Sequence, residues 1–302
     1  MRRNKLLLYI AGPTGIGKTD LSIIIAQKFN TEIISCDSRQ FYKELKIGTS
    51  PPSIKQLSTV KHHFIHNMSI HDIYSAGKYE KEGIQIINEL FEKLDVLILT
   101  GGSGLYADAI LYGIDNFPNI TDNIRKEITE EYKLSGIEVL RERLKKLDKD
   151  YYDEVDLNNS NRIIRALEVI ESTGKKFSKF RTNEKKTRNF KTHILKIDSD
   201  RELLYSRINK RVDEMIEMGL EEEAYKLKKY KNLSTLNTVG YKEFFNYFEG
   251  NMSYLDTVNK IKQNTRNYAK RQITWLRKYK EVTNIVLGEE PKSINNKIKD
   301  IL

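Results

Sequence analysis

The stretch KLLLYIAGPTGIGKTDLSIIIAQKF (residues 5–29) joins two apolar patterns through a glycine-rich loop. The continuous apolar run over residues 5–12 predicts a strand that is buried on both faces. Apolar residues over 18–29 follow helical spacing instead. Between them, GPTGIGKT (residues 12–19) matches the pattern G-x-x-x-x-G-K-[ST], which is typical of loops that bind the phosphates of ATP and other nucleotides. A buried strand, this loop and a helix predict a parallel α/β fold of the P-loop, nucleotide-kinase-like class.

The loop has the residue types that hold a phosphate group. Its glycines allow the backbone amides to wrap around an anion, and the helix that follows adds a partial positive charge. Lys18 can reach the phosphate oxygens, and the Thr19 hydroxyl is suited to Mg²⁺. The candidate phosphate contacts are Gly12, Pro13, Thr14, Gly15, Ile16, Gly17, Lys18 and Thr19.

One acidic residue that ATP-hydrolysing P-loop proteins use is absent. In those proteins a later strand ends in an aspartate that helps to hold Mg²⁺. Here the candidate strand DVLILTGG (95–102) runs through Thr100 into glycines. ATP hydrolysis is therefore less expected, and the loop is suited to a phosphate group that leaves.

Further apolar runs predict strands over residues 31–38 and 95–102, and residues 77–94 predict a helix between them. Strands that alternate with helices in this way, and that are apolar throughout, are typical of a parallel sheet with right-handed crossovers. The sequence therefore predicts an α/β core.

The pattern changes after this core begins. Residues 117–190 contain charged helices without a strand, and THILKIDSD (192–200) then returns to a strand pattern. Long helices follow, and residues 284–288 predict a late strand. We therefore expect a P-loop core from residues 1–116 and 191–302, with a mostly helical insertion between the two parts.

Polar side chains follow two of the predicted strands. Asp37, in ISCDSRQFY (34–42), and Ser103, in GGSGLYADAI (101–110), lie where open parallel sheets bind their ligands. A carboxylate beside a phosphate site suits a general base or water-mediated Mg²⁺ binding. The residues alone leave a second interpretation for each, because Asp37 could cap a following helix and Ser103 could be the N-cap of a tight turn.

Composition limits the class of protein. The 302 residues carry a formal net charge of +10, which is compatible with a polyanionic partner. The single cysteine, Cys36, excludes an internal disulfide and a multi-cysteine zinc site. Because the sequence has no apolar run of about 18 residues and no signal-peptide pattern, we expect no membrane partner and a cytoplasmic location.

Eight sequence blocks occur in a fixed order between Gly12 and Arg277: GPTGIGKT, DSRQFY, KIGT, HHFIH, GGSGLY, NRIIRALEV, VGYKE and YAKRQITWLR. In this order they resemble the bacterial tRNA dimethylallyltransferases, also called tRNA isopentenyltransferases. The resemblance covers nearly the whole chain. Each block alone is weak, but eight in register are specific.

The resemblance implies a reaction. Enzymes of this family transfer the dimethylallyl group of dimethylallyl diphosphate to N6 of adenosine-37 in the anticodon loop of tRNAs that read codons starting with U. Pyrophosphate is released. The loop at residues 12–19 would hold the diphosphate with Mg²⁺, and Asp37 would take the N6 proton. The implied partners are a tRNA anticodon stem-loop and dimethylallyl diphosphate, and we expect a monomer.

The matching motifs also imply individual site residues. Lys18, Thr19, Asp37 and Arg211 would act in catalysis, and Arg207 would help to hold the diphosphate. The implied tRNA contacts are Asp37, Ser38, Arg39, Gln40, Ser103, Arg125, Asn161, Arg162, Ile163, Ile164, Arg165, Gly240, Tyr241, Lys242, Lys270, Arg271, Gln272 and Arg277. For Arg207 and Arg211, a solvated helix face is the alternative.

Two basic stretches agree with an RNA partner. Residues 257–280 hold eight Lys or Arg and no acid, and residues 175–191 hold eight against a single Glu. Phe177, Phe180 and Phe190 are interleaved in the second stretch, which could face RNA or could be an ordinary surface with buried aromatic residues. Trp275, in the first stretch, fits a core position better than a base-stacking platform.

The segment HHFIH departs from the family pattern HHL-I-D, so that His66 replaces an acid. With His62 and His63 it forms a histidine cluster that lacks an acidic or cysteine partner, which is a weak metal signal. The segment GTSPPS (48–53) lacks the lysine of the family pattern, and Ser103 stands where threonine is usual.

Three other functions fit parts of the sequence. An adenylate isopentenyltransferase that acts on free AMP, ADP or ATP would share the loop and the base, but it needs no basic helical segments. A small-molecule kinase would use the loop for ATP. The later motifs and the missing acid at the strand end argue against this interpretation. A non-catalytic RNA-binding protein would not need Asp37.

Overall fold

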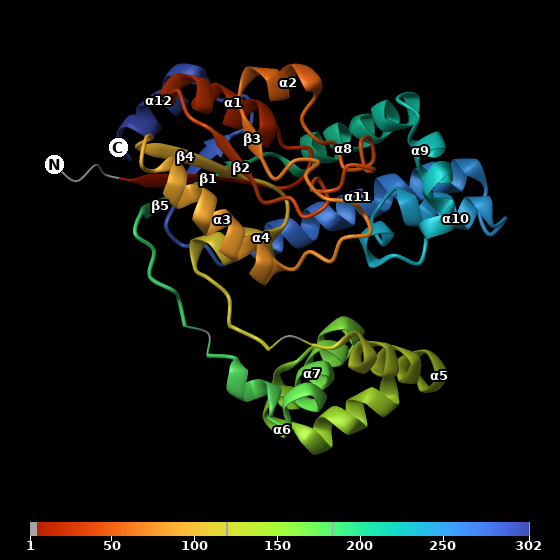
Figure 1. The fold of residues 1–302 in the computed structure, drawn as a ribbon. Helices are drawn as coiled ribbons and strands as arrows, with labels where there is room; N and C mark the ends of the chain where they lie inside the picture. The colour runs from red at the N-terminus through yellow and green to blue at the C-terminus, as the bar shows by residue number, and fades with distance from the viewer. Residues whose placement is uncertain (1–4, 119, 183, 302) are drawn as a thin grey trace. The chain divides into compact units, whose positions relative to one another are not determined.

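A single sheet of parallel strands forms the centre of the α/β fold (Figure 1). The computed structural model describes residues 5–118, 120–182 and 184–301. The strand order is β3-β2-β4-β1-β5-β6, and every pairing is parallel, which confirms the predicted fold class. The strands are β1 (Leu6–Ala11), β2 (Ile33–Ser35), β3 (His62–His63), β4 (Val96–Thr100), β5 (Lys191–Asp198) and β6 (Val282–Val286).

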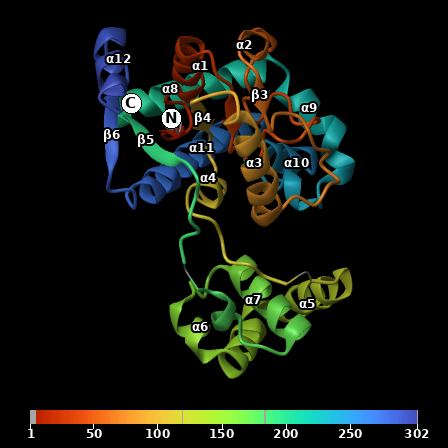
Figure 2. The ribbon, with the colours of Figure 1, turned by 60° about the vertical axis from the view of Figure 1, so that its left-hand side comes forward.

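Helices cover both faces of the sheet (Figure 2). Alternate side chains of β1 point to opposite faces of the sheet. Leu7 and Tyr9 lie in the buried cluster on one face, and Leu8 and Ile10 lie in the buried cluster on the other. The helices of this unit are α1 (Lys18–Phe29), α2 (Ile54–Thr59), α3 (Ala76–Leu90), α4 (Gly104–Leu111), α8 (Arg201–Glu217), α9 (Leu220–Leu227), α10 (Tyr241–Phe248), α11 (Tyr254–Leu276) and α12 (Pro291–Lys299), with short 3₁₀ turns η2 (Lys228–Tyr230) and η3 (Ser234–Leu236).

The two faces have different partners. Helices α3 and α4 pack on the face of Tyr9, where Tyr79 and Ile110 are fully buried. Helices α1, α8 and α12 pack on the opposite face, where Ile25 and Ile208 are buried. The inner strands β1, β2 and β4 are therefore buried along their whole length, as expected for a parallel sheet between two helical layers.

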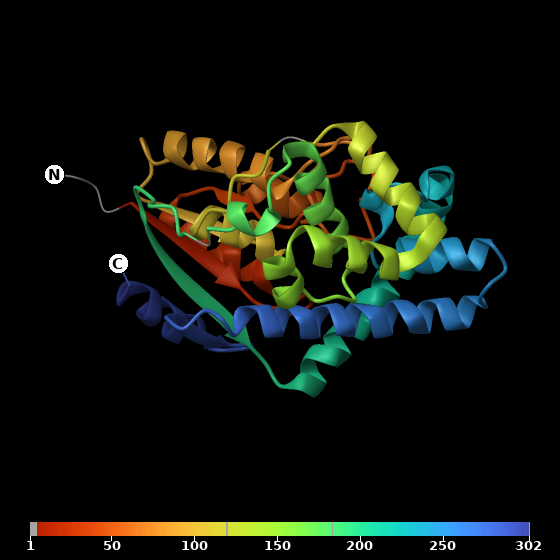
Figure 3. The same ribbon diagram turned by 90° about the horizontal axis from the view of Figure 1, so that it is seen from below.

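Helices α8 to α11 build a second core beyond the sheet. Leu220, Phe244 and Ile261 pack there against Tyr42 and Leu45 from the segment that follows β2. Figure 3 shows α11 as the long blue helix next to α8, with which it makes direct contacts. This core ties the late helices to the loop that follows the second strand.

Residues 113–186 form a compact unit of their own. It contains α5 (Asp122–Leu147), α6 (Lys149–Glu154), α7 (Ser160–Thr173) and the turn η1 (Phe177–Phe180). Its core includes Leu140, Leu144 and Leu167, all fully buried. The expected helical character is observed, and the unit begins and ends four residues earlier than the boundaries 117 and 190.

Several predicted elements differ in extent. Helix α1 has the predicted bounds, but β2 covers only Ile33–Ser35 of the run 31–38, and α3 ends at Leu90 instead of residue 94. Strand β3 was not predicted, because two histidines at the edge of a sheet carry neither an apolar run nor an alternating pattern.

The phenylalanines of the second basic stretch are core residues. Phe177 is buried and stacks on Phe117 with ring centroids 4.9 Å apart, inside the helical unit. Phe190 is buried in the other unit, where its ring lies 5.4 Å from that of Phe91. Of the two interpretations, buried aromatic residues are the correct one for these two side chains.

No helix in the described ranges is both long and apolar enough to cross a membrane.

The buried carboxylate of Asp148 holds the helical unit together. Its Oδ1 accepts from Tyr151 N at 3.2 Å and its Oδ2 accepts from Ser178 N at 2.7 Å, which links α6 to η1. We expect Asp148→Ala to lower the unfolding free energy of this unit by about 2 kcal/mol, because buried donors lose a charged partner. Hydrogen exchange of peptides from residues 113–186 measures the change.

Asp150→Ala is the matched control. Asp150 is exposed and pairs with the exposed Lys176 at 3.0 Å, so its removal should cost less than about 0.5 kcal/mol. Equal losses in the two variants would contradict the role given to Asp148.

Candidate functional site

The glycine-rich loop lies between β1 and α1, as the sequence predicts. Gly15 and Gly17 have φ values of 82° and 99°, in the left-handed region that favours glycine. Gly17 is also the residue that precedes α1, so the loop delivers its amides to the positive end of that helix. The local geometry is that of an anion-binding loop.

Three cationic side chains surround this loop. Lys18 Nζ donates to Pro13 O at 2.9 Å, and Arg207 Nε donates to Gly15 O at 2.9 Å. Arg211 Nη1 lies 3.5 Å from Thr14 Oγ1. The predicted diphosphate residues are therefore brought together. The alternative of a solvated face does not hold for Arg211, which is half-buried, whereas Arg207 is exposed and reaches the loop with its guanidinium group.

Burial lowers the pKa values of two of these cations. Desolvation lowers the pKa of Lys18 to about 8, although Asp37 acts in the opposite direction. Desolvation also lowers the pKa of Arg211, with a further contribution from Arg207. Clustered, partly desolvated cations are stabilised by an anion, which is the electrostatic signature of a phosphate site.

The Asp37 carboxylate lies at the carboxyl end of β2. Its Oδ2 accepts from Gly102 N at 3.2 Å, and its Oδ1 accepts from Arg39 N at 3.1 Å. The second bond closes a turn over two residues, and no helix starts within the turn that follows. The interpretation of Asp37 as a helix cap is therefore wrong.

Ser103 occupies the N-cap position of α4, but its side chain makes no capping bond. Its hydroxyl instead accepts from Ser38 N at 2.9 Å and lies 2.9 Å from Ser38 Oγ. The two serines thus join the loops that follow β2 and β4.

Gln272, on α11, bridges two loops with its side-chain amide. Its Oε1 accepts from Thr14 N at 2.8 Å, and its Nε2 donates to Gly102 O at 2.8 Å. The Tyr268 hydroxyl donates to the same carbonyl at 3.0 Å. Gln272 was expected to contact tRNA, but both of its polar ends already hold the walls of the site.

Arg39 and Gln40 are also occupied within the protein. Arg39 Nη1 donates to Thr235 O at 2.9 Å, and Gln40 Nε2 donates to Ser50 O at 3.0 Å. Their side chains hold neighbouring loops, and Arg39 also lines the larger of the two pockets described below and Gln40 the smaller, so the expected contact with tRNA stays a prediction.

Two pockets meet at Asp37. The larger has a volume of about 470 Å³ and is lined by the loops after β2 and β4, by α11 and by residues 237–240. The smaller, of about 60 Å³, lies over the glycine-rich loop and includes Lys18 and Thr19. Asp37, Gln272 and Arg211 line both pockets, so the carboxylate stands at their boundary.

The larger pocket has a basic and aromatic wall. Lys242 and Arg271 line it, and Trp275 is half-buried at its edge, with Lys278 Nζ 4.0 Å from the centre of the indole ring. The indole N–H has no hydrogen-bond partner among the described residues. Trp275 is therefore partly buried at the edge of the pocket, and the choice between a core position and a base-stacking platform stays a prediction. Of the other predicted contacts from this unit, Gly240 lines the pocket, and Lys270 and Arg277 are exposed.

Two expected tRNA contacts cannot be made by side chains. Ile163 and Tyr241 are both 0% exposed. Ile163 packs in the core of the helical unit, and the Tyr241 hydroxyl donates to Glu223 at 2.6 Å. A hydrophobic residue inside an amphipathic helix faces the core, even when its sequence block is functional.

The other expected contacts of the helical unit are accessible. Asn161 and Arg162 are exposed, and Ile164 is half-buried. Arg125 Nε and Arg165 Nη1 both bind the buried Glu168, at 3.0 and 3.1 Å. The two arginines are thereby fixed at the surface of α7.

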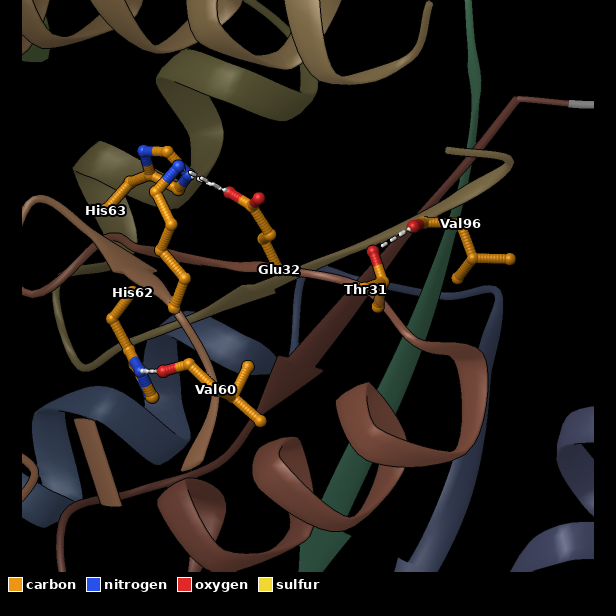
Figure 4. Close-up of polar contacts among 7 residues, drawn as sticks. Thr31, Glu32, Val60, His62, His63 and Val96 are labelled. Carbon is orange, nitrogen blue, oxygen red and sulfur yellow. Dashed lines mark hydrogen bonds and ion pairs between the residues drawn. The ribbon is translucent and has the colours of Figure 1, made fainter. Parts of the chain in front are cut away.

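The histidine segment forms the edge strand β3 (Figure 4). His63 Nε2 lies 2.5 Å from Glu32 Oε2, and His62 Nδ1 donates to Val60 O at 2.8 Å. No group of three or more metal-ligating side chains is found in the described part of the chain. The His62 Nε2 atom, in a residue that lines the smaller pocket, has no partner among the described residues.

Some site residues were missed by sequence analysis. Tyr268, Thr49 and Ser50 line the larger pocket, and Glu223 supports its wall. Tyr268 could have been found, because it lies one helical turn before Gln272 in a resembling block. Glu223 gave no signal, since two other glutamates precede it.

A parallel sheet between helical layers, with a glycine-rich loop beside a carboxylate and a helical unit inserted between α4 and β5, defines an α/β fold. The profile of the IPP transferase family matches residues 40–279. The chain belongs to this family.

Relatives and solved structures agree with this assignment. The tRNA dimethylallyltransferase of Flavobacterium psychrophilum is 49% identical over 278 residues, covering 90% of this chain and 91% of the relative. The tRNA dimethylallyltransferase 1 of Bacteroides thetaiotaomicron is 45% identical over 276 residues, covering 91% and 90%. The tRNA isopentenylpyrophosphate transferase of Bacillus halodurans superimposes with a TM-score of 0.71 at 30% identity, covering 99% and 95%. A eukaryotic dimethylallyltransferase acting on tRNA gives 0.79 at 27% identity, covering 98% and 80%.

The advantage of lysine at position 18 should depend on pH. The protonated amine holds an anion, and the pKa of Lys18 in the free protein is lowered to about 8. Compared with Lys18→Met, the wild-type protein should bind inorganic diphosphate about thirtyfold more tightly below pH 8. The advantage should shrink as the pH rises above 8, because the free amine then loses its proton. Calorimetric titration of both proteins at matched pH tests this, and a constant ratio from pH 7 to 9.5 would contradict it.

Proposed function

We propose that this protein transfers the dimethylallyl group of dimethylallyl diphosphate to N6 of adenosine-37 in the anticodon loop of tRNAs that read codons starting with U. The relatives, which are tRNA dimethylallyltransferases, support the tRNA and dimethylallyl parts of this proposal. The observation that carries it is the position of Asp37 at the boundary of the two pockets. A donor in one pocket and a nucleobase in the other would meet at that carboxylate.

The proposed reaction forms one bond and breaks another. The N6 nitrogen attacks C1 of the dimethylallyl group, and the C1–O bond breaks with its electron pair on the departing diphosphate. Asp37 accepts the proton that N6 loses. Its carboxylate is held in place by Gly102 N and Arg39 N, and this orientation toward the boundary requires no rearrangement at the moment of reaction.

The smaller pocket would hold the leaving group. Lys18, Arg207 and Arg211 supply positive charge around the loop amides, which stabilises the negative charge that develops on the diphosphate. Asp37 lines both pockets, so C1 of the dimethylallyl group would lie where the two pockets meet. In this use the glycine-rich loop binds a product, pyrophosphate, and no phosphoryl group is transferred.

Thr19 and Asp37 fit a Mg²⁺ ion. Both offer oxygen atoms in the smaller pocket, and the unpartnered His62 Nε2 belongs to a residue of the same lining. Mg²⁺ is usually held by few protein ligands together with phosphate oxygens and water, so two side chains suffice. When bound, the ion would neutralise charge on the diphosphate. Thr19 would hold it by its hydroxyl.

The larger pocket would receive the adenine. Arg271 and Lys242 supply positive charge for the RNA backbone, and the half-buried Trp275 offers aromatic surface to a splayed base. In the helical unit, Asn161 and Arg162 are exposed for further RNA contacts. A tRNA substrate would place the enzyme, which we expect to be a monomer, in the cytoplasm.

The choice of acceptor tests the proposal. Purified protein with Mg²⁺, dimethylallyl diphosphate and an unmodified anticodon stem-loop, with adenosine-37 between two adenosines, should yield N6-dimethylallyl-adenosine. Free AMP in place of the RNA should give no more than about a hundredth of that rate, because it lacks the backbone contacts. Mass spectrometry of the digested product measures both. Turnover of AMP without turnover of the stem-loop would assign the enzyme to free adenylates.

Removal of the proposed base should affect the chemical step. We expect Asp37→Ala to lower kcat by about a hundredfold to ten-thousandfold, and Asp37→Asn to be equally slow, since neither side chain accepts a proton at neutral pH. Binding of the stem-loop, measured by fluorescence anisotropy, should change by less than about threefold. Near-normal turnover by Asp37→Asn would mean that another group accepts the proton.

A further inference from the structure

The Glu223 carboxylate, on α9, binds a run of backbone amides in a distant loop. Lys46 N donates to Oε2 at 3.0 Å, Ile47 N lies 3.0 Å from both oxygens, and Gly48 N donates to Oε1 at 3.1 Å. Oε1 also accepts from the Tyr241 hydroxyl at 2.6 Å. One carboxylate therefore satisfies three consecutive amides and one hydroxyl, and hydrogen bonds to a charged acceptor are among the stronger ones in proteins.

The loop lies directly on the Tyr241 ring. A Cβ atom at Gly48 would be 2.6 Å from that ring, so the approach is possible only without a side chain. Burial and the neighbouring Glu223 raise the pKa of Tyr241, and its hydroxyl thus remains a donor. Glu223 and Tyr241 together fix the position of residues 46–48.

The other end of the loop is held by Gln40. Its Nε2 donates to Thr49 O at 3.2 Å and to Ser50 O at 3.0 Å. The loop at residues 46–50 is thus held at one end by the acceptor Glu223 and at the other end by the donor Gln40. Thr49 and Ser50, at the end of the loop that Gln40 holds, line both pockets, as Asp37 does.

We infer that Glu223 is a positioning residue that keeps the loop at residues 46–50 closed over the boundary of the two pockets and so excludes water from the reacting carbon. The inference rests on the proposed transfer reaction. Glu223 is not among the residues that line either pocket, and it acts through the three amides that it binds. Two local hydrogen bonds, from Ser50 N to Ile47 O and from Thr49 Oγ1 to Leu45 O, also shape the loop, but the amides of residues 46–48 have their partner on α9.

A loosened loop would allow a defined side reaction. Water would attack C1 in place of N6, the C1–O bond would break with its electron pair on the diphosphate, and the water would release a proton. The products would be dimethylallyl alcohol and diphosphate. An allylic centre with cationic character reacts readily with water, so the wall must keep water out while the diphosphate departs.

Hydrogen exchange tests the structural half of this inference. Glu223→Gln replaces one acceptor oxygen by a donor that faces backbone N–H groups, so protection of the amides of residues 46–48 should fall at least about tenfold. Peptides from β1 and β4 should keep their protection. Glu222→Gln is the matched control, because that neighbouring glutamate is exposed and should leave the loop unchanged. Unchanged protection of residues 46–48 in Glu223→Gln would overturn the inference.

The ratio of products tests the catalytic half. For the wild-type enzyme and for Glu222→Gln, diphosphate released and RNA prenylated should be equal. For Glu223→Gln the ratio should rise to about two or more, with dimethylallyl alcohol as the missing product. A variant that is only partly folded would lose activity at an unchanged ratio, so a ratio of one together with a loosened loop would also overturn the inference.

A second variant covers the case in which Glu223→Gln does not fold. Gly48→Ala must push the loop away from Tyr241, and it should give the same local loss of protection and the same excess of diphosphate. Failure of the proposed function itself would be distinct, because the wild-type enzyme would then prenylate no RNA while the exchange results would be unaffected.

Discussion

The peptide of Gly102 joins three elements of the site. Its N–H donates to Asp37 Oδ2, and its carbonyl accepts from Gln272 Nε2 and from the Tyr268 hydroxyl. Gln272 then continues to Thr14 N in the glycine-rich loop. Because β1, β2 and β4 are neighbours in the sheet, their loops emerge side by side, and this small network fixes the carboxylate relative to the anion-binding loop.

The network holds together charges that would otherwise separate. Lys18, Arg207 and Arg211 lie close around one loop, and burial disfavours the charged forms of Lys18 and Arg211. Such an arrangement costs stability in the free protein, and an anion in the smaller pocket offsets the cost. Asp37 offsets part of it already, since its charge raises the pKa of Lys18. The carboxylate thus has an electrostatic role beside its proposed chemical one.

Local sequence predicted the elements correctly where the pattern lay within one short stretch of the chain. The strand, loop and helix over residues 5–29 occur as predicted, because an apolar run, a glycine-rich loop and a helical period are all local properties. The position of Asp37 followed from the same reasoning, since the end of a parallel strand lies at the ligand edge of the sheet. Strand β3 was not predicted, because it forms by pairing with β2 at the edge of the sheet and has no sequence pattern of its own.

The class of fold, the glycine-rich loop and the carboxylate beside it could all be predicted from the amino-acid sequence, since spacing along the chain sets all three. The roles of the shared motif residues depend on the folded structure. Gln40 and Gln272 hold loops, Tyr241 is buried beneath one of them, and Glu223 is set apart from its neighbouring glutamates by the amides it binds. These roles come from hydrogen bonds and contacts between residues that are far apart in sequence. Such hydrogen bonds produce no periodic pattern in the sequence from which they could be predicted.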